Sequence, residues 1–121
     1  MDYHSITKPT KIVLPNFEDQ AMAKIGLIPE IISRYKSFYF QHIFSGGYSA
    51  GYYSYTWTAI LDADAFEAFA ESGDLFNPEL AAKFRHLLES GNTVEPMALY
   101  RDFRGKDPSP KALLKRKGMN S

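Results

Sequence analysis

The segment HIFSGGYSAGYYSY, residues 42–55, contains the side chains of this sequence that are best suited to chemistry. It holds one histidine, three glycines and four tyrosines. The N–H of an imidazole and the O–H of a phenol can stabilise the negative charge that develops on a carbonyl oxygen during hydrolysis. At neutral pH these donors are not nucleophiles or general bases without help. The segment therefore offers half of an active site.

The spacing of the tyrosines predicts that three phenols share one volume. If a helix extends back to Tyr48, then Tyr48, Tyr52 and Tyr55 lie at positions i, i+4 and i+7 of one face. The same spacing is also typical of an aromatic core face whose hydroxyls reach water or a backbone carbonyl. Spacing alone leaves both interpretations open.

Two glycines connect the histidine to the tyrosines. Gly46 and Gly47 allow positive φ values and leave the stretch before the helix able to move. A bend at this pair would bring His42 to the tyrosines. We therefore expect a mobile loop next to the hydrogen-bond donors.

The other half of a hydrolytic site is missing from the sequence. A zinc peptidase of the His-Glu-x-x-His type needs two histidines one helical turn apart, with the glutamate activating a zinc-bound water. The chain has only His4, His42 and His86, and none has a second histidine at that spacing. A zinc site built from all three with a carboxylate is geometrically possible, but we assign no metal ligand. There is no cysteine, no Gly-x-Ser-x-Gly motif and no phosphate-binding loop.

Composition narrows the class of protein. The 121 residues, 45% of them hydrophobic, suit one soluble globular domain. Fourteen basic and fourteen acidic residues cancel, and no lysine or arginine lies among the tyrosines, so we expect no nucleic acid partner. No apolar run could span a bilayer, and the first residues lack the features of a signal peptide. We expect no membrane partner and a cytoplasmic location.

Helical periodicity runs through most of the chain, and no convincing strand pair is present. Pro29 suits the first turn of a long helix, and Asn77 followed by Pro78 predicts the best-defined helix start. The expected fold class is all-α, with residues 1–121 forming a single helical segment. The predicted helices cover residues 16–28, 29–45, 50–71, 77–88, 95–103 and 109–117.

Three stretches of the chain resemble one family of enzymes. The sequence YFQHIFSGGYSAGYYSYTW, followed by LDADAFEAFAESGDLFNPELAAKFR and EPMALYRDFRGKDPSPKALLKRKG, is similar to the C-terminal end of the thimet oligopeptidase family of zinc metallopeptidases. The likeness is greatest to its peptidyl-dipeptidase and oligopeptidase A branch, and it extends upstream through MDYHSIT and AMAKIGLIPEIISRYKSFYF. The resemblance implies the helical C-terminal part of a zincin-like, mostly helical catalytic domain that hydrolyses short peptides.

The resemblance also implies roles for individual residues. Tyr55 would donate to the scissile carbonyl as it becomes an oxyanion, and Tyr52, one turn earlier, would assist. His42 would contact the peptide and is grouped with Tyr55 as catalytic. The residues implied in substrate binding are Tyr48, Tyr52, Gly46 and Gly47.

The family's His-Glu-x-x-His helix and its third zinc ligand, a glutamate, lie upstream of the region that this chain resembles. We therefore expect zinc in the full-length enzyme and no cofactor in this chain, which would bind a short peptide without hydrolysing it alone. Helices that pack against the absent part would expose an apolar face, which favours a homo-oligomer. The alternative is a non-catalytic helical interaction module that self-associates, with its tyrosines in the core.

Overall fold

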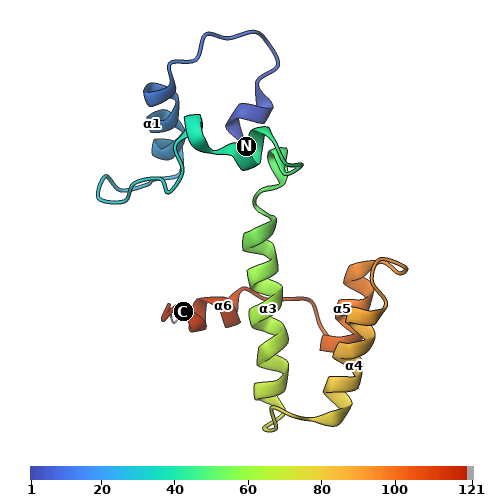
Figure 1. Ribbon diagram of the computed structural model, residues 1–121. Coiled ribbons are helices and arrows are strands. Elements are labelled where there is room, and N and C mark those ends of the chain that lie inside the picture. Colours follow the sequence, from blue (N-terminus) through green and yellow to red (C-terminus); the bar gives the residue numbers. More distant parts are fainter. Residues whose placement is uncertain (120–121) are drawn as a thin grey trace. The chain divides into compact units, whose positions relative to one another are not determined.

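The computed structural model describes residues 1–119 as helices joined by turns and loops (Figure 1). No strand is present in these residues, so the predicted all-α fold class is confirmed. Their contacts divide the chain into two compact units, Met1–Tyr53 and Ser54–Ser121. Within the described part of the chain, no helix is both long enough and apolar enough to cross a membrane.

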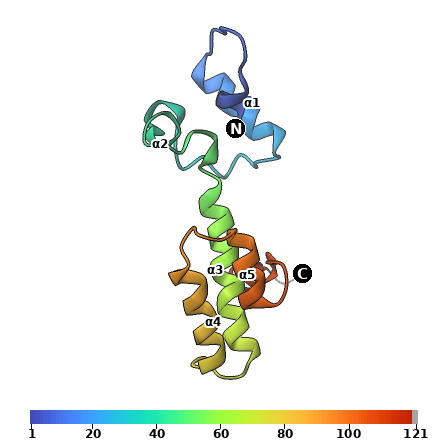
Figure 2. The same cartoon turned by 90° about the vertical axis from the view of Figure 1, so that its right-hand side faces the viewer.

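The second unit is built on α3 (Ser54–Glu71), the longest helix in residues 1–119. A short turn leads into α4 (Pro78–Glu89), which runs in the opposite direction to α3 (Figure 2). The unit continues with α5 (Pro96–Arg104) and α6 (Lys111–Arg116). Helix α5 packs against α4, and α6 packs against α3.

The core of the second unit combines small residues of α3 with aromatic residues of α5. Ala65 and Ala68 are buried on α3, and Tyr100 and Phe103 are buried on α5. Because an alanine side chain is a single methyl group, the aromatic rings can lie close to the α3 backbone. Partly buried residues surround this core: Leu61, Phe69, Leu80, Phe84, Leu87 and Met97.

Side-chain caps begin two helices of the second unit. The Asn77 side chain accepts hydrogen bonds from the backbone N–H groups of Glu79 and Leu80 at 3.0 and 3.1 Å, and Pro78 occupies the first turn. The predicted start at this position is confirmed. Glu95 caps α5 in the same way by accepting from two backbone N–H groups.

The first unit has no buried residue in its helices and is held by contacts between partly exposed side chains. The ring of Tyr3 lies 4.5 Å from that of Phe17, and its hydroxyl bonds to the Ser37 hydroxyl. The Glu18 carboxylate accepts a hydrogen bond from the Ser37 backbone N–H. The elements of the unit are η1 (Asp2–Ser5), α1 (Leu14–Lys24), η2 (Ser37–Tyr39), α2 (Gln41–Phe44) and η3 (Ser49–Gly51).

The predicted helix over residues 29–45 is wrong. Turns and bends occupy residues 29–36, and only the short helices η2 and α2 follow. The Ser37 N–H donates to Glu18 and not to a carbonyl one turn earlier. The aromatic and β-branched residues of this run have modest helix propensity, and several remain largely exposed, such as Phe38 at 74%. Without burial of an apolar face, packing does not supply the stability that a long helix needs.

Helix α3 also begins later than predicted, at Ser54. Ser49 has φ of 45°, in the left-handed region, and lies in the tight turn η3. Tyr48 and Tyr52 therefore precede α3 and do not share a helix face with Tyr55. The predicted spacing on one helix is wrong because the turn, and not a helical repeat, sets the positions of the first two tyrosines.

Candidate functional site

Three of the predicted site residues come together in the first unit. The His42 ring on α2 lies 5.8 Å from the Tyr48 ring and 5.4 Å from the Tyr52 ring, measured between centroids. The two phenol rings are 5.7 Å apart and meet edge to face at 78°. We refer to His42, Tyr48 and Tyr52 as the donor cluster. Its members place one imidazole and two phenols around one small volume.

The donor cluster forms because the chain reverses direction after α2. Ser45 is extended at the end of that helix, and Gly46 and Gly47 follow with φ of 100° and 85°. Residues with a side chain rarely adopt these values. A Cβ at either glycine would meet nothing within 4 Å. The backbone conformation therefore requires the glycines, and the space around them stays open.

Two further aromatic residues support the donor cluster. Tyr35 stacks on Phe40 with ring centroids 4.9 Å apart and an interplanar angle of 15°. Phe40 in turn meets the Tyr52 ring edge to face at 4.8 Å. Offset-stacked and edge-to-face contacts are favoured arrangements of aromatic rings. These two ring contacts therefore hold the Tyr52 ring in its orientation. Tyr35 and Phe40 lie in the range predicted as a helix, and the sequence did not predict their contacts with the donor cluster.

The surroundings of Tyr52 favour its neutral form. Burial raises the pKa of the Tyr52 phenol above its ordinary value, and the Tyr35 phenol raises it further. The Arg34 guanidinium opposes this increase in pKa without reversing it. A phenol with a raised pKa remains a hydrogen-bond donor at neutral pH. Tyr52 therefore suits the stabilisation of a carbonyl oxygen better than the removal of a proton.

Tyr55 belongs to the second unit, in the first turn of α3. It is 53% exposed, and its backbone carbonyl accepts a hydrogen bond from the Thr58 hydroxyl at 3.1 Å. The structure therefore brings His42, Tyr48 and Tyr52 into one cluster and places the fourth predicted side chain in the other unit.

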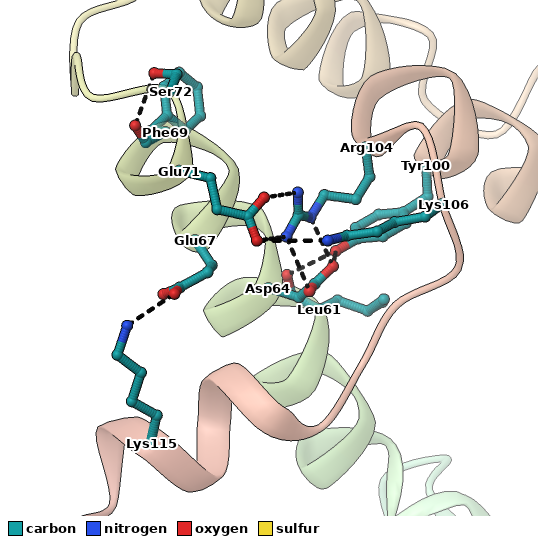
Figure 3. A network of polar contacts seen from close by, with 10 residues as sticks. All are labelled: Leu61, Asp64, Glu67, Phe69, Glu71, Ser72, Tyr100, Arg104, Lys106 and Lys115. Atoms are coloured by element: carbon teal, nitrogen blue, oxygen red, sulfur yellow. Dashed lines mark hydrogen bonds and ion pairs between the residues drawn. The ribbon is translucent and has the colours of Figure 1, made fainter.

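A buried polar network that was not predicted from the sequence joins α3 and α5 (Figure 3). Asp64 and Arg104, with side chains 3% and 5% exposed, form an ion pair with Nε and Oδ2 3.1 Å apart. The Tyr100 hydroxyl donates to Asp64 at 2.8 Å, and Arg104 also donates to Glu71 at 2.6 Å. Across residues 1–119, every buried side-chain nitrogen and oxygen has a hydrogen-bond partner. The network is therefore complete in itself.

The charges of this network stabilise one another. Hydrogen bonding to Arg104 lowers the pKa of the Glu71 carboxyl to about 2, and the bond to Glu71 raises the pKa of Arg104. Burial and the hydrogen bond to Asp64 raise the pKa of Tyr100. The spacing of Tyr100 and Arg104, four residues apart on α5, is the sequence signal that could have indicated a shared polar face.

The described residues do not fit a metal. Within residues 1–119, no three His, Asp or Glu side chains lie close enough together to hold an ion. A zinc site needs at least three protein ligands around one point. His42 instead lies among aromatic rings, at 6.2 Å from Tyr35 and 6.4 Å from Phe40.

Comparison with known proteins shows the family of the chain. Residues 1–119 match the profile of Peptidase family M3. The chain belongs to peptidase family M3. This confirms the resemblance to oligopeptidases and peptidyl-dipeptidases, and it makes the chain a hydrolase by family.

Similar proteins occur in bacteria, plants and yeast. The chain is 42% identical over 107 residues to the dipeptidyl carboxypeptidase of Escherichia coli, covering 87% of this chain and 16% of that protein. It is 49% identical over 81 residues to oligopeptidase A of Haemophilus influenzae, covering 66% and 12%. A probable cytosolic oligopeptidase A of Arabidopsis thaliana is 45% identical over 84 residues, with coverage of 66% and 12%. The chain thus spans about 12% to 16% of the length of these M3 relatives.

Proposed function

We propose that this chain supplies the substrate-binding and oxyanion-stabilising side chains of a zinc-dependent M3 peptidase that cleaves short peptides. The observation that carries the proposal is the convergence of His42, Tyr48 and Tyr52 in a chain of this family. An oligopeptidase and a dipeptidyl carboxypeptidase among the relatives support either mode of cleavage.

Each residue of the proposed site has a role that suits its chemistry. His42 and Tyr48 donate hydrogen bonds to the bound peptide, and the glycine turn between them lets the loop close on it. Tyr55 donates to the scissile carbonyl oxygen as that oxygen gains negative charge, with Tyr52 assisting as a neutral phenol. His42 and Tyr55 are the catalytic pair of this assignment.

Activation of the attacking water lies outside this chain in our proposal. The donor cluster contains neutral donors, and the described residues hold no cluster that fits zinc. We assign the zinc ion, which would activate the water, to the remaining part of an M3 polypeptide. Residues 1–121 would then form one portion of a single catalytic domain.

Peptide binding tests the donor cluster directly. A hexapeptide labelled with fluorescein at its N-terminus should bind the purified chain, and fluorescence anisotropy gives the affinity. Tyr48→Phe and Tyr52→Phe each remove one hydroxyl, and we expect each to weaken binding about threefold to tenfold. Tyr53→Phe is the matched control, because Tyr53 is 68% exposed and lies outside the donor cluster. Equal affinities for the parent and all three variants would contradict the proposal.

A hydrolysis assay tests the proposal that the zinc site lies outside this chain. The purified chain with added zinc should leave the hexapeptide intact, as judged by mass spectrometry after prolonged incubation. Cleavage that a chelator abolishes would mean that the chain holds its own zinc site, and the assignment of zinc to another part of the polypeptide would be wrong.

A second candidate function, a helical interaction module that self-associates, is favoured by the apolar surface of the second unit. A groove of about 530 Å³ opens between α3, α4 and α5. Apolar surface of this kind is commonly covered by a partner or by a second copy. Its apolar lining includes Trp57, Leu61, Phe84, Leu87, Leu88 and Met97.

We also propose a cytoplasmic location. The name of the Arabidopsis thaliana relative, a probable cytosolic oligopeptidase A, supports it. Fractionation of cells that express the full-length parent protein, followed by immunoblotting, should recover it with cytoplasmic markers, and recovery with organelles would contradict the proposal.

A further inference from the structure

The segment before α2 carries four aromatic residues, and two of them are partly buried. Tyr35 and Phe40 are the partly buried pair, whereas Phe38 and Tyr39 are exposed. The Phe40 ring contacts the Tyr52 ring of the donor cluster and stacks on Tyr35 on its other side. The side chains that this segment buries are therefore those that lead to the donor cluster.

The Tyr35 side chain also reaches the donor cluster directly. Its ring lies 6.2 Å from the His42 ring, and its hydroxyl is hydrogen-bonded to the Tyr52 phenol. Burial is the main cause that raises the pKa of Tyr52, and this bond raises it further. A bond with that effect favours the neutral phenol, so the Tyr52 O–H donates it to the Tyr35 oxygen. Phe40 can orient the Tyr52 ring, but only a polar side chain such as Tyr35 can orient its O–H group.

The Tyr35 ring is itself held on both sides. After it in the chain, the Glu18 carboxylate of α1 pairs with Lys36 at 3.4 Å and accepts a hydrogen bond from the Ser37 backbone N–H. Before it, the Arg34 guanidinium lies over the Tyr35 ring, with Cζ 5.2 Å from the ring centroid. A side chain that is held before a ligand arrives lowers the ordering cost of binding. Tyr35 is therefore suited to hold another side chain in place.

We infer that Tyr35 is a positioning residue that holds the Tyr52 hydroxyl for the bound peptide. The inference rests on the proposed function, in which Tyr52 assists at the carbonyl oxygen. In the free chain, the Tyr52 O–H is directed to the Tyr35 oxygen. When a peptide carbonyl accepts that hydrogen bond instead, the Tyr35 hydroxyl reverses and donates to the Tyr52 oxygen, because a hydroxyl is both donor and acceptor. A phenol that accepts such a bond is a stronger donor itself.

Titration of the phenols tests the contact between Tyr35 and Tyr52 without a peptide. The ultraviolet absorbance of phenolate is followed against pH, and the difference between the parent and Tyr52→Phe gives the titration of Tyr52. The same difference is measured in the presence of Tyr35→Phe. We expect the pKa of Tyr52 to be lower there, because the bond that favours the neutral phenol is lost while the ring remains. An unchanged pKa overturns the inference. The charged and titratable groups around Tyr52 are Arg34, Tyr35, His42 and Tyr48.

A double-mutant cycle with the labelled hexapeptide tests the positioning role in binding. Tyr35→Phe should weaken binding by the parent chain about threefold, and it should leave the affinity of Tyr52→Phe unchanged, because its effect passes through the Tyr52 hydroxyl. Equal weakening in both backgrounds would mean that Tyr35 supports the segment and not the hydroxyl, and it overturns the inference. An affinity of the parent that Tyr35→Phe leaves unchanged or increases overturns it as well.

The control and the outcomes separate the inference from the proposed function. Tyr39→Phe removes a hydroxyl from a neighbouring ring that is 52% exposed, and it should change neither the pKa of Tyr52 nor the affinity. Binding that depends on the Tyr48 and Tyr52 hydroxyls but not on Tyr35 overturns the inference and leaves the proposed function standing. Failure of the parent chain to bind the hexapeptide overturns both, whatever the titration shows. Far-UV circular dichroism confirms that each variant keeps its helices.

Discussion

At the scale of single residues, Arg104 is a charged side chain that is almost completely buried in the second unit. Its side chain is 5% exposed, yet it is paired with a carboxylate that is itself 3% exposed, Asp64. The Nε and Nη2 groups of the guanidinium donate to Asp64, and Nη1 and Nη2 donate to Glu71. A guanidinium can serve two carboxylates at once because its donors form a rigid fork.

Removal of Arg104 should therefore destabilise the second unit strongly. We expect Arg104→Met to lower the free energy of unfolding by about 3 kcal/mol, because the buried Asp64 charge loses its partner. Urea unfolding followed by circular dichroism measures this value. Arg101→Met, which breaks an exposed ion pair with Asp107, should change it by less than about 1 kcal/mol. If both substitutions lowered the free energy of unfolding equally, burial of the Arg104–Asp64 pair would not increase its contribution to stability.

The low pKa of Glu71 predicts acid sensitivity. The pKa is about 2 in the folded chain against an ordinary value of 4.5, so the stabilisation is present above pH 4.5 and is lost as the pH falls toward 2. Because the Glu71 side chain is 48% exposed, we expect a contribution of only about 1 kcal/mol.

The measurement for Glu71 is a pair of urea titrations at pH 7 and pH 2.5. The free energy of unfolding of Glu71→Gln should lie about 1 kcal/mol below that of the parent at pH 7, and the two should approach each other at pH 2.5. Glu89→Gln, at an exposed ion pair with Arg85, is the control. If the difference in the free energy of unfolding between parent and Glu71→Gln were the same at both pH values, ionisation of Glu71 would not be its cause.

Tyr55 tests whether a proposed catalytic hydroxyl also stabilises the fold. Because the residue is 53% exposed, we expect Tyr55→Phe to change the free energy of unfolding by less than about 0.5 kcal/mol. Tyr100→Phe, which removes a buried hydroxyl bonded to Asp64, should cost about 1 to 2 kcal/mol and serves as the contrast. A loss at Tyr55 as large as that at Tyr100 would favour the core interpretation of the tyrosines.

At the scale of elements, local residues set two helix ends of the second unit. Helix α4 starts at a capping asparagine followed by proline, and α5 ends at Gly105 with φ of 74°. Residues 29–36 form turns although Pro29 suits a first helical turn, because no apolar face of this run is buried. Local signals thus account for the start of α4 and the end of α5, whereas α1 and α6 form without a side-chain cap.

Loss of the α4 cap should be measurable by itself. Asn77→Ala removes the oxygen that accepts from two backbone N–H groups, and we expect the free energy of unfolding to fall by about 1 kcal/mol. Asn92→Ala is the control, because Asn92 is an exposed residue outside the helices. Thermal unfolding of both variants gives the comparison, and a larger loss at Asn92 than at Asn77 would show that the cap is not what stabilises this helix start.

At the scale of the whole molecule, large apolar side chains remain at the surface of both units. Phe76 is 89% exposed, Ile32 is 79% exposed and Phe38 is 74% exposed. The chain corresponds to at most 16% of the length of the M3 relatives compared above. Surfaces of this kind favour association with another polypeptide or with a second copy.

We therefore predict that the purified chain self-associates at micromolar concentration. Light scattering should give a mass above the 13.7 kDa of one chain. Leu88→Asp, in the apolar groove of the second unit, should weaken association about tenfold, because a charge would replace a leucine that is 64% exposed in the single chain and that a second copy would cover. Val94→Asp is the matched control, since Val94 is 50% exposed and lies outside the groove lining. A monomeric parent chain would exclude self-association as its function.

The all-α class, the start of α4 at Asn77 and the membership of the M3 family could be predicted from the sequence. These features depend on periodicity, on contacts within one turn of helix, and on residue identities that can be compared directly. The way in which His42 meets Tyr48 and Tyr52 depends on the folded chain, because a glycine turn and not a helix face joins them. The folded chain also decides the pairing of Asp64 with Arg104, which are 40 residues apart in the chain. Asp64 and Arg104 come together only when α3 and α5 pack, and no local pattern specifies that packing.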